Sequence, residues 1–264
     1  SLGARNQVNY NNDSFVSWNW KANGGTTTTN DASSTGVGTL DSVFQANTTA
    51  GFSIVTYTGF GETVKTIAHG LGVIPQMIIF KSRGSAGAWH VYHQSTGNTK
   101  TLYFNTTSAA TTDNNFLNQV TPTDTLITLG TSSGANPENV TMVAYCFAEV
   151  EGYSRFGIYT GNGDNDGTFV FLGFRPSFIM TKRATGGTSN WIIQDSVRQT
   201  ANPSDAWLRP NTSDDEGDTS PDLDLDFVSN GFKIRNNGTD NNINGSTYIY
   251  MAFAEAPFKY ANAR

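Results

Sequence analysis

The sequence predicts an all-β protein made of tandem antiparallel β-sandwich modules of jelly-roll-like type, and three observations support this prediction. Thr and the aromatic residues, which favour strands, are frequent, and the abundant Gly and Asn favour the turns between strands. No long stretch carries a helical apolar stripe without interruption by Gly or β-branched residues. Short motifs also recur roughly a hundred residues apart, which is within the usual size range of a domain.

The recurring motifs keep their order along the chain. Their separation drifts slowly, as expected when insertions fall in loops. The matching positions are Tyr57 and Tyr159, Leu71 and Leu172, Pro75 and Pro176, Lys81 and Lys182, Trp89 and Trp191, and Phe147 and Phe253. We therefore expect two copies of one β-sandwich module, at residues 51–151 and 152–264.

Each copy contains short strand-like runs separated by Gly/Asn-rich turns, the pattern of an antiparallel sandwich. The runs 77–80 and 178–180 are apolar without alternation, so we expect central strands that are covered on both faces. The expected strands lie near 52–58, 63–69, 76–82, 88–94, 100–105, 115–119, 124–129 and 140–149 in the first copy, and near 155–160, 167–171, 177–183, 190–195, 206–208, 224–228, 231–235 and 246–255 in the second.

The first 22 residues carry the pattern that closes each module. Val16, Trp18 and Trp20 alternate with other residues, as the apolar residues of a half-buried strand do. The matching sets are Val143, Tyr145 and Phe147 in the first copy and Ile249, Met251 and Phe253 in the second. We interpret residues 1–22 as the closing hairpin of an incomplete preceding module, and we expect residues 8–22 to pair with a sheet, because an isolated hairpin is marginal in water.

Residues 23–50 combine a Thr/Ser/Gly run with three apolar residues, Leu40, Val43 and Phe44. Such a polar run is typical of a connecting segment. We interpret it as a linker that these three side chains anchor on a module surface.

The charge and cysteine content restrict the partners. The net charge of −6 and the pI of about 5.0 disfavour nucleic acid and anionic membranes as partners. No apolar run is long enough to span a bilayer, so we expect no membrane insertion. The single cysteine, Cys146, permits no internal disulfide and is expected in the core.

Acidic loops offer the only cofactor that we expect, a Ca²⁺ ion. Residues 162–167 resemble the start of a calcium loop, but Gly173 stands where the last carboxylate is needed, and a hairpin turn explains the same residues. A second run, which has no counterpart in the first copy, carries Asp214, Asp215, Glu216 and Asp218. Either a solvated loop or a weak Ca²⁺ site is expected there.

Three aromatic residues without evident counterparts in the other copy are candidates for glycan binding. Tyr92, Tyr103 and Trp207 lie near loops. Aromatic rings with polar tips suit stacking on sugar rings. The alternative is ordinary half-buried packing.

No motif indicates catalysis. The sequence contains no G-x-S-x-G, H-E-x-x-H or phosphate-binding loop. Glu149 and Glu255 are candidate catalytic acids, but each of them follows the same Phe-Ala dipeptide at the end of a copy. A position shared by both copies favours an architectural role, so we expect no enzyme activity.

Several long stretches resemble a known family. They are FVSWNWKANGGTTTTN, GFSIVTYTGFGETVKTIAHGLGVIPQMIIFKSR, WHVYHQ and the ending YIYMAFAEAPFKYANAR. They are similar to the repeated β-module of tail-fibre and other virion structural proteins from marine tailed bacteriophages, including cyanophages. The resemblance covers essentially the whole chain. It implies tandem modules, a location in the virion and host attachment, and it supplies no catalytic residues.

These observations predict a non-enzymatic virion structural protein, in a tail fibre or appendage, that attaches to host-surface glycan. The expected partners are other virion proteins, copies of the chain in a homo-oligomer such as a trimer, and a host glycan or receptor, bound with avidity. The expected contact regions are loops 106–114, 132–139, 161–167, 196–222 and 236–245. Two alternatives remain open: a capsid decoration or head-fibre protein, and a surface-polysaccharide depolymerase.

Overall fold

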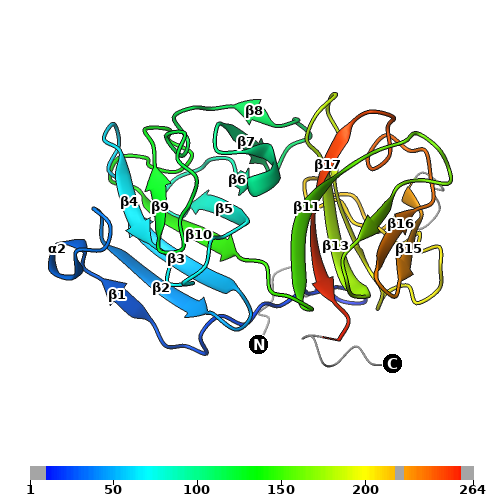
Figure 1. Cartoon of the computed structure of the whole chain (residues 1–264), viewed down its shortest axis with the longest axis horizontal. Coiled ribbons are helices and arrows are strands. Elements are labelled where there is room, and N and C mark those ends of the chain that lie inside the picture. The colour runs from blue at the N-terminus through cyan, green and yellow to red at the C-terminus, as the bar shows by residue number, and fades with distance from the viewer. Residues whose placement is uncertain (1–9, 218–222, 257–264) are drawn as a thin grey trace.

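Two β-sandwich modules pack face to face in the computed structural model, which describes residues 10–217 and 223–256 (Figure 1). Each module has a large sheet and a small sheet, and the two large sheets meet in the middle of the molecule. The fold-class prediction is therefore confirmed. Within the described residues, no helix is long and apolar enough to cross a membrane.

The large sheet of the first module has the strand order β1-β2-β3-β10-β5-β6-β7-β8, and its small sheet pairs β4 with β9. A short helix, α2 (Ala32–Thr35), follows β1, and a 3₁₀ turn, η1 (Gln94–Thr96), follows β6. The strands are β1 (Thr28–Asn30), β2 (Ser42–Asn47), β3 (Phe52–Thr58), β4 (Lys65–Ala68), β5 (Met77–Ser82), β6 (His90–His93), β7 (Lys100–Tyr103), β8 (Thr111–Thr112), β9 (Leu126–Leu129) and β10 (Thr141–Phe147).

The second module repeats this arrangement. Its large sheet has the order β11-β17-β13-β14, which matches β3-β10-β5-β6, and its small sheet has the order β12-β16-β15. The strands are β11 (Ser154–Thr160), β12 (Phe169–Phe171), β13 (Pro176–Arg183), β14 (Trp191–Asp195), β15 (Leu225–Val228), β16 (Gly231–Ile234) and β17 (Thr247–Ala254).

The pairing register is also the same in both modules. Equivalent residues lie opposite each other: Tyr57–Met142 matches Tyr159–Tyr248, Ile79–Tyr145 matches Met180–Met251, and Ile79–Val91 matches Met180–Ile193. A slip of one residue would turn every side chain of a strand to the other face of the sheet. The agreement therefore shows that the sequence repeat is a structural repeat.

Each module has its own core between its two sheets. In the first module, Ile78 and Phe80 of the large sheet pack in one buried cluster with Ile67 and Ile127 of the small sheet. Cys146 belongs to this cluster, as expected. The second module has the corresponding core around β13, β16 and β17. The predicted strand at 115–119 is wrong, because residues 114–119 form turns that bury Phe116 and Leu117 in the first core.

A third cluster, the shared core, lies between the two large sheets. Its largest members are Phe52, Met77 and Phe147 of the first module and Phe178, Trp191 and Phe253 of the second. Because side chains alternate along a strand, β5 and β13 each bury one face in their own module and the other in the shared core. The prediction of central strands covered on both faces is confirmed.

A buried asparagine holds the loops at one end of each module. Asn136 is 1 % exposed; its Nδ2 lies within 3.0 Å of three backbone carbonyl oxygens, and its Oδ1 accepts the N–H of Phe60 at 2.7 Å. Asn242 has the equivalent position, with three acceptors near its Nδ2 and the N–H of Asn162 at 3.0 Å from its Oδ1. Each buried amide therefore satisfies backbone groups that belong to separate loops.

The interface between the modules also contains a buried histidine. His93 ends β6, and its Nδ1 accepts the N–H of Ser95 at 3.2 Å. Its Nε2 therefore carries the proton and donates to the carbonyl oxygen of Tyr250, on β17, at 3.3 Å. Burial lowers the pKa of His93 from 6.5 to about 4, despite the bond to Tyr250.

We expect acid to destabilise the protein through His93. Between pH 6.5 and 4 the unfolded chain binds a proton at this residue and the folded chain does not, so stability falls as pH falls through this range. His93→Asn keeps an acceptor near the N–H of Ser95 and does not titrate. Urea unfolding of both proteins should show that the wild type loses up to about 3 kcal/mol more than His93→Asn over this range. Parallel stability curves would contradict the assignment.

The interpretation of residues 23–50 as a linker is wrong. Two strands of this segment join the large sheet of the first module: β2 pairs with β3, and β1 pairs with β2. Asp31 caps α2 by accepting the N–H groups of Ser33 and Ser34. Of the three predicted anchors, Leu40 and Phe44 do pack against the first core, and Val43 lies opposite Thr56 in the ladder.

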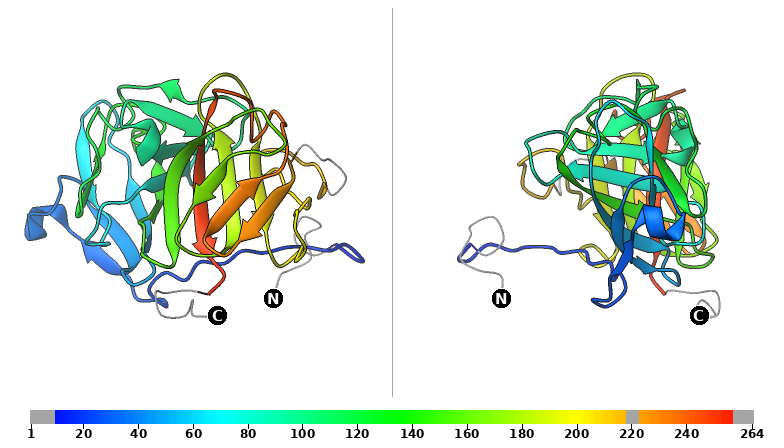
Figure 2. Two further views of the ribbon diagram at one scale, coloured as in Figure 1. Left: turned by 45° about the vertical axis from the view of Figure 1, so that its right-hand side comes forward. Right: turned by 90° about the vertical axis from the view of Figure 1, so that its left-hand side faces the viewer.

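The segment expected to be a closing hairpin has no strand in its described part, residues 10–22, which we call the N-terminal arm. The arm runs along the base of the molecule, and its outer end projects beyond the second module (Figure 2). It is held through its side chains, because Trp18 and Trp20 pack against the shared core. The expected pairing of residues 8–22 with a sheet is therefore not present within residues 10–22, and residues 8 and 9 lie outside the described residues.

Candidate functional site

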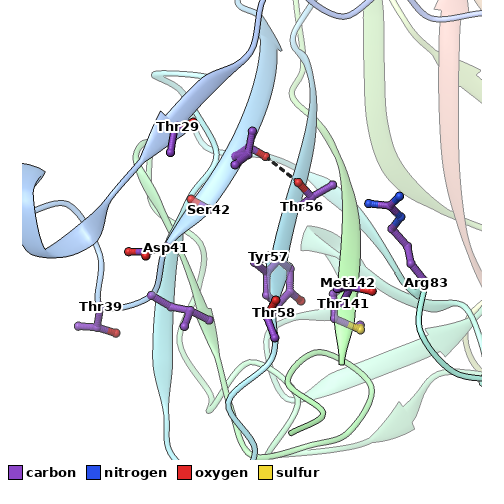
Figure 3. A pocket seen from close by; sticks show the side chains of 12 residues that line it. Thr29, Thr39, Asp41, Ser42, Thr56, Tyr57, Thr58, Arg83, Thr141 and Met142 are labelled. Atoms are coloured by element: carbon purple, nitrogen blue, oxygen red, sulfur yellow. Dashed lines mark hydrogen bonds between the residues drawn. The ribbon is translucent and has the colours of Figure 1, made fainter. Parts of the chain in front are cut away.

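An open pocket of about 590 Å³ lies on the large sheet of the first module (Figure 3). Strands β2, β3 and β10 contribute most of its lining, together with Thr29 of β1 and Arg83, which follows β5. Its polar side chains are Thr29, Thr39, Asp41, Thr56, Thr58, Arg83 and Thr141. Ser42 also borders it, but its hydroxyl is buried and donates to the carbonyl oxygen of Ala68. Hydroxyl groups therefore dominate the polar lining.

Strand alternation explains why hydroxyl groups gather here. Along β3, Val55 and Tyr57 point into the first core, so Thr56 and Thr58 lie on the opposite face of the sheet. Thr141 pairs with Thr58 in the β10–β3 ladder and adds a third threonine beside them. The strands β1 and β2 extend this surface beyond β3 and make it wider than its counterpart in the second module.

Two opposite charges flank the threonines. Figure 3 shows Asp41 on one side of Thr56, Thr58 and Thr141 and Arg83 on the other. The carboxylate of Asp41 accepts the N–H of Ala32 at 2.9 Å, which holds it at the end of the loop. The backbone N–H of Arg83 donates to the carbonyl oxygen of Thr141 at 2.8 Å. The guanidinium of Arg83 is exposed and forms no ion pair with a carboxylate in residues 10–217 and 223–256.

This lining is suited to binding and contains no histidine or cysteine to act as base or nucleophile. Hydroxyl groups both donate and accept hydrogen bonds, as sugar hydroxyls do. The guanidinium of Arg83 matches the planar geometry of a carboxylate and can also donate to neutral oxygen atoms. The pocket can therefore accept a ligand that is rich in hydroxyl groups and has an anionic group at one end.

The predicted aromatic glycan site does not form. Tyr92 is 1 % exposed within the first core, where burial raises its pKa to about 12, so it cannot stack on a sugar. Tyr103 is half-buried, with its ring 5.0 Å from that of His90. Trp207 is 8 % exposed, and the guanidinium carbon of Arg209 lies 4.2 Å from its ring centre. The alternative, ordinary packing, describes all three.

The acidic run of the second module lies next to Trp207, since Trp207 and Gly217 exchange backbone hydrogen bonds. Asp214 pairs with Arg209 at 3.7 Å, and Glu216 pairs with Arg198, so arginines balance two of the predicted calcium ligands. Asp215 lines a neighbouring pocket with the N-terminal arm, and Asp218 lies outside the described residues. In the part of the chain that the structure describes, no group of three His, Cys, Asp or Glu residues is placed to hold a metal ion.

Sequence analysis missed the residues of the Figure 3 pocket. Much of its lining comes from residues 29–43, which were interpreted as a linker, and threonines on a strand carry no distinctive motif.

The sequence predicted an architectural role for Glu149 and Glu255. Glu255 pairs with Arg175 at 3.0 Å, and Glu149 Oε2 lies 3.5 Å from the N–H of Phe156.

Comparisons with curated proteins and with solved structures find no match to this chain. A family model does match residues 1–257, which include both modules and the N-terminal arm. The match treats the two modules as one unit, in agreement with the shared core between them. The chain thus belongs to the family described as a domain of unknown function, DUF7483.

Proposed function

We propose that the protein is a non-enzymatic component of a bacteriophage tail fibre or other virion appendage and that it binds glycan on the host surface. The observation that supports glycan binding is the open, hydroxyl-lined pocket with Arg83 at one side. A glycan chain offers many hydroxyl groups, and acidic sugars add the carboxylate that an unpaired guanidinium favours. The virion location rests on the resemblance of the sequence to modules of phage structural proteins.

The packing of the modules supports an adhesive role. The shared core fixes the two modules together, so the pocket is held on a stiff body. A rigid site loses little conformational freedom when it binds. Several copies in one appendage would combine weak individual sites through avidity.

The test is a glycan array followed by titration calorimetry with the best-binding glycan. We expect binding of acidic glycans, and we expect Arg83→Ala to weaken it about tenfold or more, because a charge-assisted hydrogen bond is lost. Lys100→Ala on β7, away from the pocket, removes the same charge and should bind like the wild type. Equal binding by both variants would rule out this pocket, and absence of binding to any glycan would count against the function.

A further inference from the structure

Three equivalent aromatic residues meet at the centre of the molecule. Phe147 and Phe253 hold the same position in the closing strands of the two modules, and the pattern of the arm places Trp20 at that position too. The ring centres are 6.0 Å apart for Trp20 and Phe147, 5.4 Å for Trp20 and Phe253, and 6.4 Å for Phe147 and Phe253. This is the triangle that three equivalent strands around a three-fold axis would produce.

The contact between the two modules is of the head-to-tail kind. A loop of the first module, residues 103–107, covers a face of the second that includes Lys182 and Trp191. The indole N–H of Trp191 donates to the carbonyl oxygen of Tyr103 at 2.9 Å, and its ring lies 5.0 Å from that of Phe104. Lys182 Nζ donates to the carbonyl oxygen of Thr107 at 3.2 Å. Different surfaces of the same module are therefore used on the two sides of the contact.

The first module has a face equivalent to the Lys182/Trp191 face, and the second has a loop equivalent to residues 103–107. Within the described residues, no module packs against either of these two surfaces. Lys81 and Trp89 are the counterparts of Lys182 and Trp191, but they are half-exposed, and Lys81 lies 5.7 Å from the ring of Trp89. Residues 209–213 are the counterpart of the covering loop. Matching hydrogen bonds support this equivalence: Asn105 Oδ1 accepts the backbone N–H of Trp89, and Asn211 Oδ1 accepts the backbone N–H of Trp191.

An apolar groove of about 520 Å³ lies beside the arm, and residues 209–213 reach it through Pro210. Its lining includes Trp18 and Trp20 of the arm, Phe104 and Tyr145 of the first module, and Met180 and Pro210 of the second. The groove thus opens next to the aromatic triangle.

We infer that a third β-module of this kind, whose closing strand is residues 14–20, occupies this groove and completes a ring of three modules. Head-to-tail contacts either close into a ring or continue indefinitely, and the aromatic triangle fixes closure at three. The third module covers Lys81 and Trp89 with its own loop and receives residues 209–213 on its own tryptophan face. The inference is independent of the proposed glycan binding.

The test extends the full chain by placing a copy of residues 51–140 directly before residue 14, so that the arm supplies the closing strand of the added module. Hydrogen exchange is then compared between the original and extended proteins. We expect residues 15–20, 84–90 and 208–213 to exchange at least about a hundredfold more slowly in the extended protein, because each gains a partner. As a control, Trp20→Glu in the extended protein should keep 15–20 protected and release the other two peptides.

Three results would overturn the inference. One is protection of residues 15–20 alone, which would mean that the added module folds as a separate domain and does not pack against the other two. The second is protection of 84–90 and 208–213 in the original chain that depends on its concentration, which assigns the groove to a second copy. If the extension fails to fold, a second one built from residues 152–246 replaces it, and a lack of protection in both rejects the ring.

Discussion

Replacing Trp191 by alanine is expected to lower the free energy of unfolding by about 4 kcal/mol, the upper part of the range for large-to-small core substitutions. The side chain is 1 % exposed and belongs to the shared core, where its ring packs against Phe104 of the other module. The substitution leaves a cavity there, and it removes the hydrogen bond to the carbonyl oxygen of Tyr103.

The repeat supplies a matched control for this substitution. Trp89 stands at the equivalent position of the first module and is half-buried, with Lys81 beside its ring. Trp89→Ala should therefore cost only about 1 kcal/mol, in the range of partly exposed sites. Both variants are compared by urea unfolding at neutral pH. Equal losses would mean that the contact between the modules adds nothing at Trp191.

The second large effect is expected at the buried asparagines. Asn136→Ala and Asn242→Ala should each destabilise the protein by about 3 kcal/mol, because both side chains are buried and several backbone groups lose their partner at once. The two losses should be similar, since each side chain makes four contacts, although one acceptor of Asn242 is the side-chain oxygen of Asn162.

The control for the asparagines is Asn98. Its Nδ2 donates to Gln119 and Thr121, but the side chain is only half-buried. Water can replace those bonds, so Asn98→Ala should cost less than about 1 kcal/mol. If Asn98→Ala is as destabilising as the buried pair, the anchoring role is wrong.

The sequence was most informative where local pattern and fold agree. The alternation in Tyr145 and Phe147, repeated in Met251 and Phe253, identified the closing strands, and the motif spacing identified the repeat, although the first module begins before residue 51, with β1 and β2. The register confirms this, because the same spacing places equivalent residues opposite each other. Such features depend on periods of two residues, which are visible in one dimension.

The burial of individual side chains could not be predicted from the same patterns. Trp89 and Trp191 share a motif but differ in burial, because only the second is covered by a loop of the other module. Tyr92 is surrounded by the first core, although its sequence neighbours include two histidines. Both differences arise from contacts between residues that are distant along the chain.

The strands β1 and β2 were missed for a related reason. Their residues are mainly small and polar, with glycines at 36 and 38 between them. The strand propensity of these residues is low, and pairing of β2 with β3 holds the segment in the sheet. The polar sequence that hid these strands also supplies Thr29 and Thr39 to the Figure 3 pocket.

Urea unfolding of the wild type, Asn136→Ala and Asn242→Ala tests most directly whether two copies of one module share a single core. The two asparagines lie in different modules, and each one holds loops of its own module. If the core couples the modules, each protein should unfold in one transition, and both variants should lower its midpoint to a similar extent. Two transitions, with Asn136→Ala shifting only one and Asn242→Ala only the other, would show that the modules are independent and would contradict this account.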